Sequence, residues 1–254
     1  MLKLEGVSKN FGGLPALSQV SFEAAQGLVT ALIGPNGAGK STLINCVTGV
    51  LPPSSGSVRF QQKEITQVAA HKIARSGIAR TFQNLKLFPR LSVLDNVLTG
   101  LTCQGGESML MAMLRLPYLR HRERQLKLRA MEALDRFGLS DKADWPAGVL
   151  AYGDKKRVEL ARAVVSQPRL LLLDEPVAGL NAEETVEVGE QLRLLRSAGH
   201  TMLLVEHDME LVMELADQVV VLDSGRCIAT GTAEEVRSNP LVLEAYLGRM
   251  EATA

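Results

Sequence analysis

The chain has 254 residues, of which 46% are hydrophobic and 22% are charged, so it is long enough for one or two folded cores and is not intrinsically disordered. Its 28 basic and 28 acidic residues balance, which gives no indication of a nucleic-acid partner. The cysteines, Cys46, Cys103 and Cys227, are far apart and lack metal-ligand spacing. We interpret them as small core residues in a reducing compartment.

The chain lacks the sequence features of secretion or of membrane insertion. Its N-terminus has no apolar segment behind a basic start, so no signal peptide is predicted. The apolar runs at 170–173 and 219–222 fall far short of the roughly 20 residues that span a bilayer. We expect a soluble, cytoplasmic chain, and any membrane that it serves to be spanned by another polypeptide.

The first half of the chain is predicted to begin with strands and to continue with helices. Short strands separated by Gly, Pro and Ser are expected over residues 2–7, 20–24, 28–34 and 57–60. A helix is expected over 40–49, and residues 67–137 are more polar and read as helical. There, Leu128, Met131, Leu134 and Phe137 recur every three residues and are interpreted as one apolar face.

After residue 150 the pattern alternates between helices and apolar strands. Helices over about 154–166, 182–198 and 208–216 precede strands at 169–174, 201–206 and 217–223. Short, fully apolar strands separated by helices predict a parallel sheet covered on both faces. A last amphipathic helix is expected in the C-terminal tail.

A glycine-rich loop follows the predicted strand 28–34. The sequence GPNGAGKST matches Gly-x4-Gly-Lys-Ser/Thr between a strand and a helix, which is the context that a phosphate-binding loop requires. Lys40 would reach the β- and γ-phosphates, and the Ser41 hydroxyl would bind Mg²⁺. The expected nucleotide contacts in this loop are Gly34, Pro35, Asn36, Gly37, Ala38, Gly39, Lys40, Ser41 and Thr42.

Two carboxylates follow the apolar strand of the sequence LLLLDEP. Asp174 ends the strand, where open α/β sheets bind ligands, and would hold Mg²⁺ through water. Glu175 is placed to act as the general base that polarises the attacking water. A hydrophobic-Asp-Glu sequence alone is weak, but about 130 residues after a phosphate loop it becomes strong.

Three further residues become candidates for the nucleotide site because these motifs are present. His207 follows another apolar strand; alone it would be a surface or capping residue, and here a contact to the γ-phosphate is favoured. Gln83 would otherwise be polar surface, and here it is a candidate to coordinate Mg²⁺ or orient water. Phe11 offers a ring on which adenine stacks, or else belongs to the core.

The ordered sequences GPNGAGKST, TFQ, LAYGD, LLLLDEP, AGLN and LVEH resemble those of the nucleotide-binding subunit of an ATP-binding cassette (ABC) transporter. The stretches GIARTFQNLKLFPRLSVLDNVL, DEPVAGLN and NPLVLEAYLG are similar to the branched-chain amino-acid importers. The resemblance implies an α/β fold: a RecA-like P-loop NTPase core with an antiparallel β subdomain and a helical signature subdomain. It implies one ABC ATPase domain, with core and β subdomain at about 1–82 and 167–238, the helical subdomain at about 83–166 and a C-terminal helix at about 239–254.

The resemblance also implies residue roles. Phe11 would stack on adenine, Gln83 would be the Q-loop glutamine, and His207 the switch histidine. Ala151 and Gly153 lie in the signature, which contacts the nucleotide of a second cassette in a head-to-tail dimer, and Asn181 falls at the D-loop position. The expected ligands are ATP and Mg²⁺, with Ser41, Gln83 and Asp174 around the metal and Glu175, His207, Gln83 and Lys40 serving catalysis.

The implied partners are integral-membrane permease subunits, docking near Gln83, a second cassette that is a copy or a paralogue, and indirectly a periplasmic solute-binding protein. The chain would act on the cytoplasmic face of the bacterial inner membrane, where ATP hydrolysis energises uptake of branched-chain amino acids or related solutes such as urea and amides. The alternatives are a lipopolysaccharide-export ATPase and a soluble cassette ATPase that acts on ribosomes or DNA. A P-loop kinase or GTPase is disfavoured because no Asn-Lys-x-Asp sequence is present.

The signature LAYGD departs from the usual Leu-Ser-Gly-Gly-Gln. Ala151 lacks the serine hydroxyl, a loss of about 1.5–3 kcal/mol if no water substitutes, whereas Gly153 and the start of a helix remain. Asp154 would repel a triphosphate unless it points away, and the basic run 155–157 could offset its charge. We predict that Asp154→Gln changes ATPase activity less than about tenfold, under roughly 1.4 kcal/mol in barrier.

Overall fold

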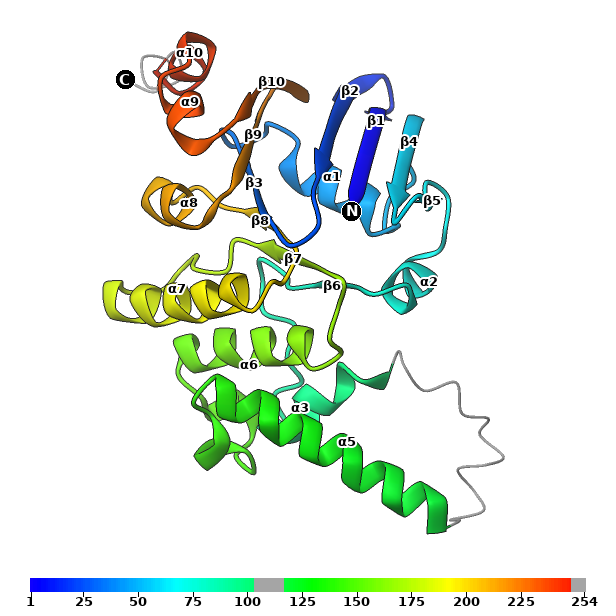
Figure 1. Ribbon diagram of the computed structural model, residues 1–254, viewed down its shortest axis with the longest axis vertical. Coiled ribbons are helices and arrows are strands. Elements are labelled where there is room, and N and C mark those ends of the chain that lie inside the picture. Colours follow the sequence, from blue (N-terminus) through cyan, green and yellow to red (C-terminus); the bar gives the residue numbers. More distant parts are fainter. Residues whose placement is uncertain (103–116, 248–254) are drawn as a thin grey trace. The chain divides into compact units, whose positions relative to one another are not determined.

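The computed structural model describes residues 1–102 and 117–247, in two compact units that are treated separately below (Figure 1). The first unit comprises Met1–Ile78, Leu170–Glu175 and the described part of Leu192–Ala254. The second comprises Ala79–Arg169, without its undescribed stretch, and Pro176–Gln191. Cys103 and the end of the expected C-terminal helix lie outside the described residues, and the domain boundaries drawn from the sequence stay predictions.

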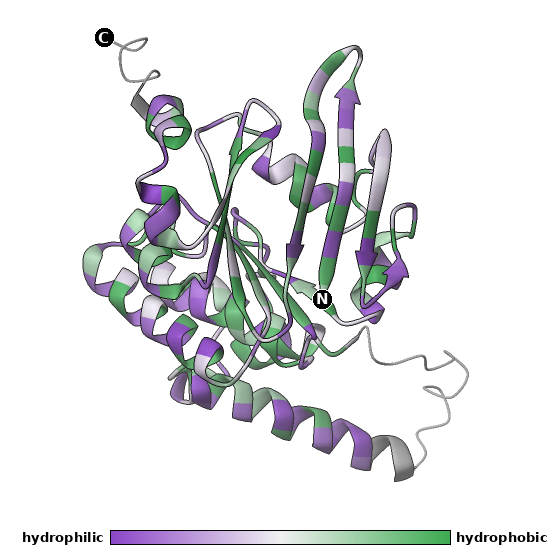
Figure 2. Cartoon of the chain, turned by 45° about the horizontal axis from the view of Figure 1, so that its top comes forward, coloured by the Kyte–Doolittle hydropathy of each residue, from purple (hydrophilic) through white to green (hydrophobic). Residues whose placement is uncertain are grey.

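The first elements of the first unit belong to an antiparallel sheet. Within the described residues its strand order is β2-β1-β4-β5, with β1 Leu2–Phe11, β2 Leu14–Ala24, β4 Ser55–Phe60 and β5 Lys63–Glu64. Leu2 of β1 pairs with Ala24 of β2 and with Phe60 of β4. Leu2, Leu4 and Val7 are fully buried, and Figure 2 shows apolar and polar bands alternating along these strands, as expected when only one face of a sheet is covered.

A second sheet of the described chain has the order β10-β9-β3-β8-β7-β6. Strands β3, β7, β8 and β9 run parallel, and β10 is antiparallel to β9. Both faces of the parallel strands are covered: on β3, Leu32 joins one buried cluster, whereas Ala31 and Ile33 join another. The bounds are β3 Val29–Ile33, β6 Ile78–Arg80, β7 Leu170–Asp174, β8 Met202–Val205, β9 Gln218–Asp223 and β10 Arg226–Gly231.

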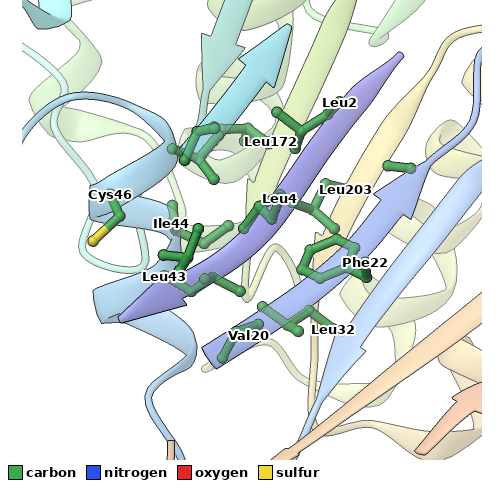
Figure 3. Close-up of a cluster of buried hydrophobic side chains, with 14 of the residues drawn as sticks. Leu2, Leu4, Val20, Phe22, Leu32, Leu43, Ile44, Cys46, Leu172 and Leu203 are labelled. Carbon is green, nitrogen blue, oxygen red and sulfur yellow. The ribbon is translucent and has the colours of Figure 1, made fainter. Parts of the chain in front are cut away.

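The main core of the first unit lies among both sheets and α1 (Lys40–Val47). Figure 3 shows Leu2, Leu4 and Phe22 of the antiparallel sheet beside Leu43 of α1 and Leu203 of the parallel sheet, all members of one buried cluster. The second cluster joins the parallel sheet to α8 (Met209–Leu215), α9 (Ala233–Arg237) and α10 (Pro240–Leu247). This unit also contains α2 (Ala70–Arg75) and the end of α7 (Ala182–Ser197). The predicted parallel sheet, covered on both faces, is therefore present in the first unit.

In the described part of the second unit the regular elements are helices and 3₁₀ turns, apart from the first two residues, which end β6. Its elements are α3 (Val93–Thr99), α5 (Pro117–Arg136), the 3₁₀ turns Ser140–Lys142 and Ala147–Val149, α6 (Tyr152–Val164) and the start of α7 (Ala182–Ser197). The interpretation of 67–137 as helical throughout was wrong in part, because β6 is a strand and residues 81–92 form no helix.

The apolar face expected on α5 was also placed wrongly. Leu134 and Phe137 are buried, but Leu128 is 56% exposed. Residues three apart on an α-helix are separated by about 300°, so a strict three-residue repeat drifts around the helix instead of following one face. The buried positions are Ala130, Ala133, Leu134 and Phe137, at the i, i+3, i+4, i+7 spacing of a helix that packs on one side.

Candidate nucleotide site and signature helix

The loop Gly34–Thr42 joins β3 to α1 in the first unit, and two of its glycines are required by the backbone. Gly34 has a φ of 148°, and a Cβ there would lie 2.1 Å from the carbonyl oxygen of Leu222. Gly39 has a φ of 101°, and a Cβ there would lie 2.7 Å from the carbonyl oxygen of Ala16. Side chains are therefore excluded where the loop turns into the helix, which leaves its amides accessible to an anion.

Lys40, the first residue of α1, folds back over this loop. Its ammonium donates to the carbonyl oxygens of Gly34 at 2.6 Å and Pro35 at 3.2 Å, and the residue is 8% exposed. Burial lowers the pKa of Lys40, whereas the charges of Glu175 and Asp174 act to raise it. The charges of both carboxylates therefore reach the lysine of the phosphate loop.

Asp174 and Glu175 lie at the carboxyl end of β7. Asp174 is 3% exposed and pairs in register with Val205 of β8. Glu175 continues this pairing, since its N–H donates to the Val205 carbonyl at 2.9 Å, but its φ is 50°. A left-handed backbone at a residue other than glycine costs roughly 1–3 kcal/mol and is common at functional sites. The strain turns the chain just where the expected base lies.

His207 lies in the short connection from β8 to α8. Its ring is 64% exposed, whereas the preceding residue, Glu206, is fully buried. The Glu206 carboxylate accepts the N–H of His207 at 3.0 Å, and Asp208 caps α8 by accepting the N–H of Leu211 at 3.1 Å. The backbone on both sides of the histidine is thus fixed, while its ring stays accessible.

Phe11 ends β1 and is 46% exposed, so it is not a core residue. The ammonium of Lys9 lies 5.4 Å from the centre of its ring. An exposed aromatic ring with a cation beside it offers a flat surface for a base, as adenine stacking requires.

The described residues contain no group of three or more His, Cys, Asp or Glu side chains arranged to hold a metal ion. Two of the oxygen ligands that the sequence suggested for Mg²⁺ lie in the first unit. Ser41 is an exposed residue at the start of α1, and Asp174 is buried at the end of β7. Gln83 belongs to the second unit. A hydroxyl and a carboxylate fit a hard cation that completes its shell with phosphate and water.

In the second unit, α6 holds the loop that carries Gln83. The Gln83 side chain is exposed, and the backbone carbonyl of Gln83 accepts from the ammonium of Lys156 at 3.5 Å. Further along the loop, the carbonyl of Lys86 accepts from Arg162 at 2.5 Å. Glu159 lies between these basic residues of α6; burial raises the pKa of its carboxyl, and the charges of both act against that shift. One face of α6 therefore fixes the backbone around Gln83.

The signature forms the start of α6. Ala151 is the N-cap residue, and the N–H of Gly153 donates to Glu184 Oε1 at 3.1 Å. Asn181 precedes α7, and its side chain accepts the N–H of Glu184 at 2.9 Å. The structure thus brings the predicted residues Gly153 and Asn181 to the same glutamate.

Asp154 is turned into its own unit. It is 7% exposed and accepts from the ammonium of Lys142 at 2.6 Å and from the guanidinium of Arg157. Burial would raise the pKa of this carboxyl, but the hydrogen bonds and charges of Lys142 and Arg157 outweigh burial and lower it. The basic run 155–157 thus offsets the charge through Arg157, joined by Lys142, which the sequence did not suggest.

Sequence reasoning missed three acidic residues with direct contacts to these segments: Glu184, Glu206 and Glu159. For Glu184 a signal existed, because Asn181 with an acidic residue three positions later is a capping-box pattern. Glu206 and Glu159 are 0% and 2% exposed, and no local pattern distinguishes such carboxylates from surface ones before the fold is known.

Comparisons with known proteins agree with this geometry. The ABC transporter family model matches residues 17–178, and a branched-chain amino acid ATP-binding cassette transporter model matches 226–252. The chain is 42% identical over 249 residues to the high-affinity branched-chain amino acid transport ATP-binding protein LivG of Salmonella typhimurium, and 41% identical to BraF of Pseudomonas aeruginosa, covering 98% of each chain in both cases. A solved ATP-binding cassette of an ABC transporter in its ADP conformation aligns with a TM-score of 0.84 at 36% identity, covering 98% of both chains.

Fold and sequence together define an ATP-binding cassette ATPase. The chain belongs to the ABC transporter family, and both relatives given above are named as branched-chain amino acid transport ATP-binding proteins. This confirms the predicted family, fold class and enzyme class, and it excludes a P-loop kinase or GTPase. None of the helices in the described residues combines the length and apolar character needed to cross a membrane.

Proposed function

We propose that this chain is the ATP-hydrolysing subunit of an importer for branched-chain amino acids or a related small polar solute. The observation that carries the proposal is the phosphate loop itself, where the buried Lys40 folds back over Gly34 and Pro35 and the charges of Asp174 and Glu175 act on its ammonium. The relatives match this chain over 98% of its length, and their names, branched-chain amino acid transport ATP-binding proteins, support branched-chain amino acids as the solute class. The same names do not favour lipopolysaccharide export or a soluble ATPase acting on ribosomes or DNA.

In the proposed reaction the phosphate loop, Gly34–Thr42, binds the triphosphate through its amides, and Lys40 exchanges its loop carbonyls for phosphate oxygens. Glu175 takes a proton from the attacking water as the water oxygen bonds to the γ-phosphorus. The bond between that phosphorus and the β,γ-bridging oxygen breaks, and ADP leaves. His207 contacts the γ-phosphate with its exposed ring. These groups stabilise charge that develops on the transferred phosphoryl group.

Mg²⁺ would be held by the hydroxyl of Ser41 and, through water, by Asp174, both in the first unit. Bound there, the ion neutralises phosphate charge. The role of Gln83 at the metal stays a prediction from the sequence. Phe11 stacks on the adenine ring, and its 46% exposure supports that role.

The proposed assembly contains two cassettes, head to tail, and two permease subunits. Each ATP then lies between the phosphate loop of one cassette and the signature of the other, contacted by Ala151, Gly153 and Asn181. A periplasmic binding protein delivers the solute to the permease. The chain acts at the cytoplasmic face of the inner membrane, docked by the segment around Gln83.

The solute can be tested by transport in the native bacterium. A strain lacking this chain, complemented with the wild type or with Glu175→Gln, is assayed for uptake of labelled leucine, isoleucine, valine and urea. We expect the wild type alone to restore uptake of the branched-chain amino acids, with urea uptake equal in all strains. Loss of urea uptake with normal leucine uptake would move the assignment to a related solute, and unchanged uptake of all four would contradict the proposal.

A further inference from the structure

Glu184 joins the starts of two helices in the second unit. Its Oε2 accepts the N–H of Asn181 at 3.1 Å, while the Asn181 side chain accepts the N–H of Glu184 at 2.9 Å. These reciprocal bonds form a capping box at the start of α7. The other oxygen, Oε1, accepts the N–H of Gly153 in the first turn of α6 at 3.1 Å. One carboxylate therefore satisfies amides at both helix N-termini.

The glycine of the signature is explained by this close approach. Gly153 lies within α6, and a Cβ at this position would lie 2.6 Å from Glu184 Oε1 and 2.9 Å from its Cδ. Both distances are shorter than van der Waals contact permits, so the missing side chain is what lets the carboxylate reach the amide. The ring of Tyr152 likewise lies close to Gly179, since a Cβ there would lie 3.3 Å from it.

The residue before α6 makes this contact more important. Ala151 has no side-chain oxygen, so it cannot accept from the first amides of the helix in the way that serine would. The positive end of the helix dipole favours an anion at the same place. Glu184 supplies that anion from α7.

In the proposed two-cassette site, the Gly153 amide binds the terminal phosphate of the ATP held by the partner. We propose that Glu184 is a positioning residue that occupies the phosphate position at Gly153 until ATP displaces it. The inference rests on the proposed function and deepens it. Oε2 stays hydrogen-bonded to the N–H of Asn181 when Oε1 leaves Gly153, so α7 does not unwind. The same carboxylate therefore links phosphate binding at the signature to Asn181 in the D-loop.

Glu184→Gln is designed to keep the hydrogen bond from the N–H of Asn181 and to remove the one from the N–H of Gly153. Glutamine has one acceptor oxygen, which a capping box uses to bind the N–H of Asn181, and its amide nitrogen cannot accept from Gly153. The matched control is Glu183→Gln, which removes the same charge from an exposed neighbour in the same helical turn. Each change is made in the full chain carrying Glu175→Gln, so that ATP is bound without being consumed.

Association of the chains is measured by light scattering as ATP is raised, and circular dichroism confirms that each variant is folded. We expect Glu184→Gln to lower the ATP concentration for half-maximal association about three- to tenfold, because a competing hydrogen bond is removed. Glu183→Gln should change it by less than about twofold.

Two results would overturn the inference. An equal or higher half-maximal ATP concentration for Glu184→Gln would show that this residue only supports the helix, and the proposed function would stand. Absence of any ATP-dependent association in the Glu175→Gln chain would contradict a site formed by two copies of this chain, and with it this inference for such a pair, whereas the proposed function with a paralogous second cassette would stand.

Discussion

Replacing Asp154 by asparagine tests whether the signature helix is anchored by a buried ion pair. The carboxylate receives hydrogen bonds from Lys142 and Arg157, whose side chains are 26% and 19% exposed. A hydrogen bond to a charged group contributes about 1.5–3 kcal/mol. Asparagine keeps one acceptor oxygen, and the partly exposed cations regain water, so we expect a net loss of about 2 kcal/mol in the free energy of unfolding near pH 7.

The assay is urea unfolding followed by the fluorescence of Trp145, the one tryptophan of the chain. Trp145 reports on the region around Lys142, because the backbone N–H of Trp145 donates to the backbone carbonyl of Lys142 at 3.0 Å. The control is Asp144→Asn, at an exposed neighbouring position, which should change the free energy by less than about 0.5 kcal/mol.

The pH dependence has a defined sign. Because the folded pKa of Asp154 is lowered, its stabilisation is present above the ordinary carboxyl pKa of about 3.9 and is lost as pH falls through the folded value. The difference between wild type and Asp154→Asn should therefore shrink below about pH 4. Equal stability at pH 7, or a difference that grows in acid, would refute the reasoning.

Three further substitutions have defined outcomes. Lys40→Ala should weaken ATP binding about ten- to a hundredfold, measured by calorimetric titration, because it removes a charged hydrogen-bond donor to phosphate; an unchanged affinity would remove Lys40 from the site. Gly34→Ala should lower stability by more than about 2 kcal/mol in urea, because its Cβ would lie 2.1 Å from the Leu222 carbonyl, and wild-type stability would contradict the loop geometry. Asp208→Ala should cost about 1 kcal/mol in thermal unfolding by removing the cap of α8, and no shift in the midpoint would mean that the cap contributes nothing.

The elements that the sequence predicted well are those with a local signal. Strand 169–174 was expected and β7 spans Leu170–Asp174, because a strand covered on both faces is apolar along its length. The helix expected over 182–198 is α7, Ala182–Ser197. By contrast, β6 has only three residues, and the apolar face of α5 was assigned from a repeat that does not match the helical period.

For the site, the sequence predicted candidate residues, whose roles stay predictions, but not the contacts that hold them. The order of the phosphate loop and of Asp174 and Glu175 implied their meeting, because the carboxyl ends of parallel strands share one edge of a sheet. The bond between Gly153 and Glu184 joins positions 31 residues apart, and no periodic pattern encodes such a distance. The orientation of the Asp154 side chain likewise depends on the position of Lys142 in the folded unit, which the sequence alone does not give.

The most direct test of the account is ATP turnover by Glu175→Gln beside the wild type, with ATP binding measured on the same samples. We predict that the variant binds ATP with an affinity within about threefold of the wild type and hydrolyses it at least about a hundredfold more slowly, since the general base is lost while the phosphate loop is intact. Hydrolysis at the wild-type rate would contradict the assignment of Glu175 as the base.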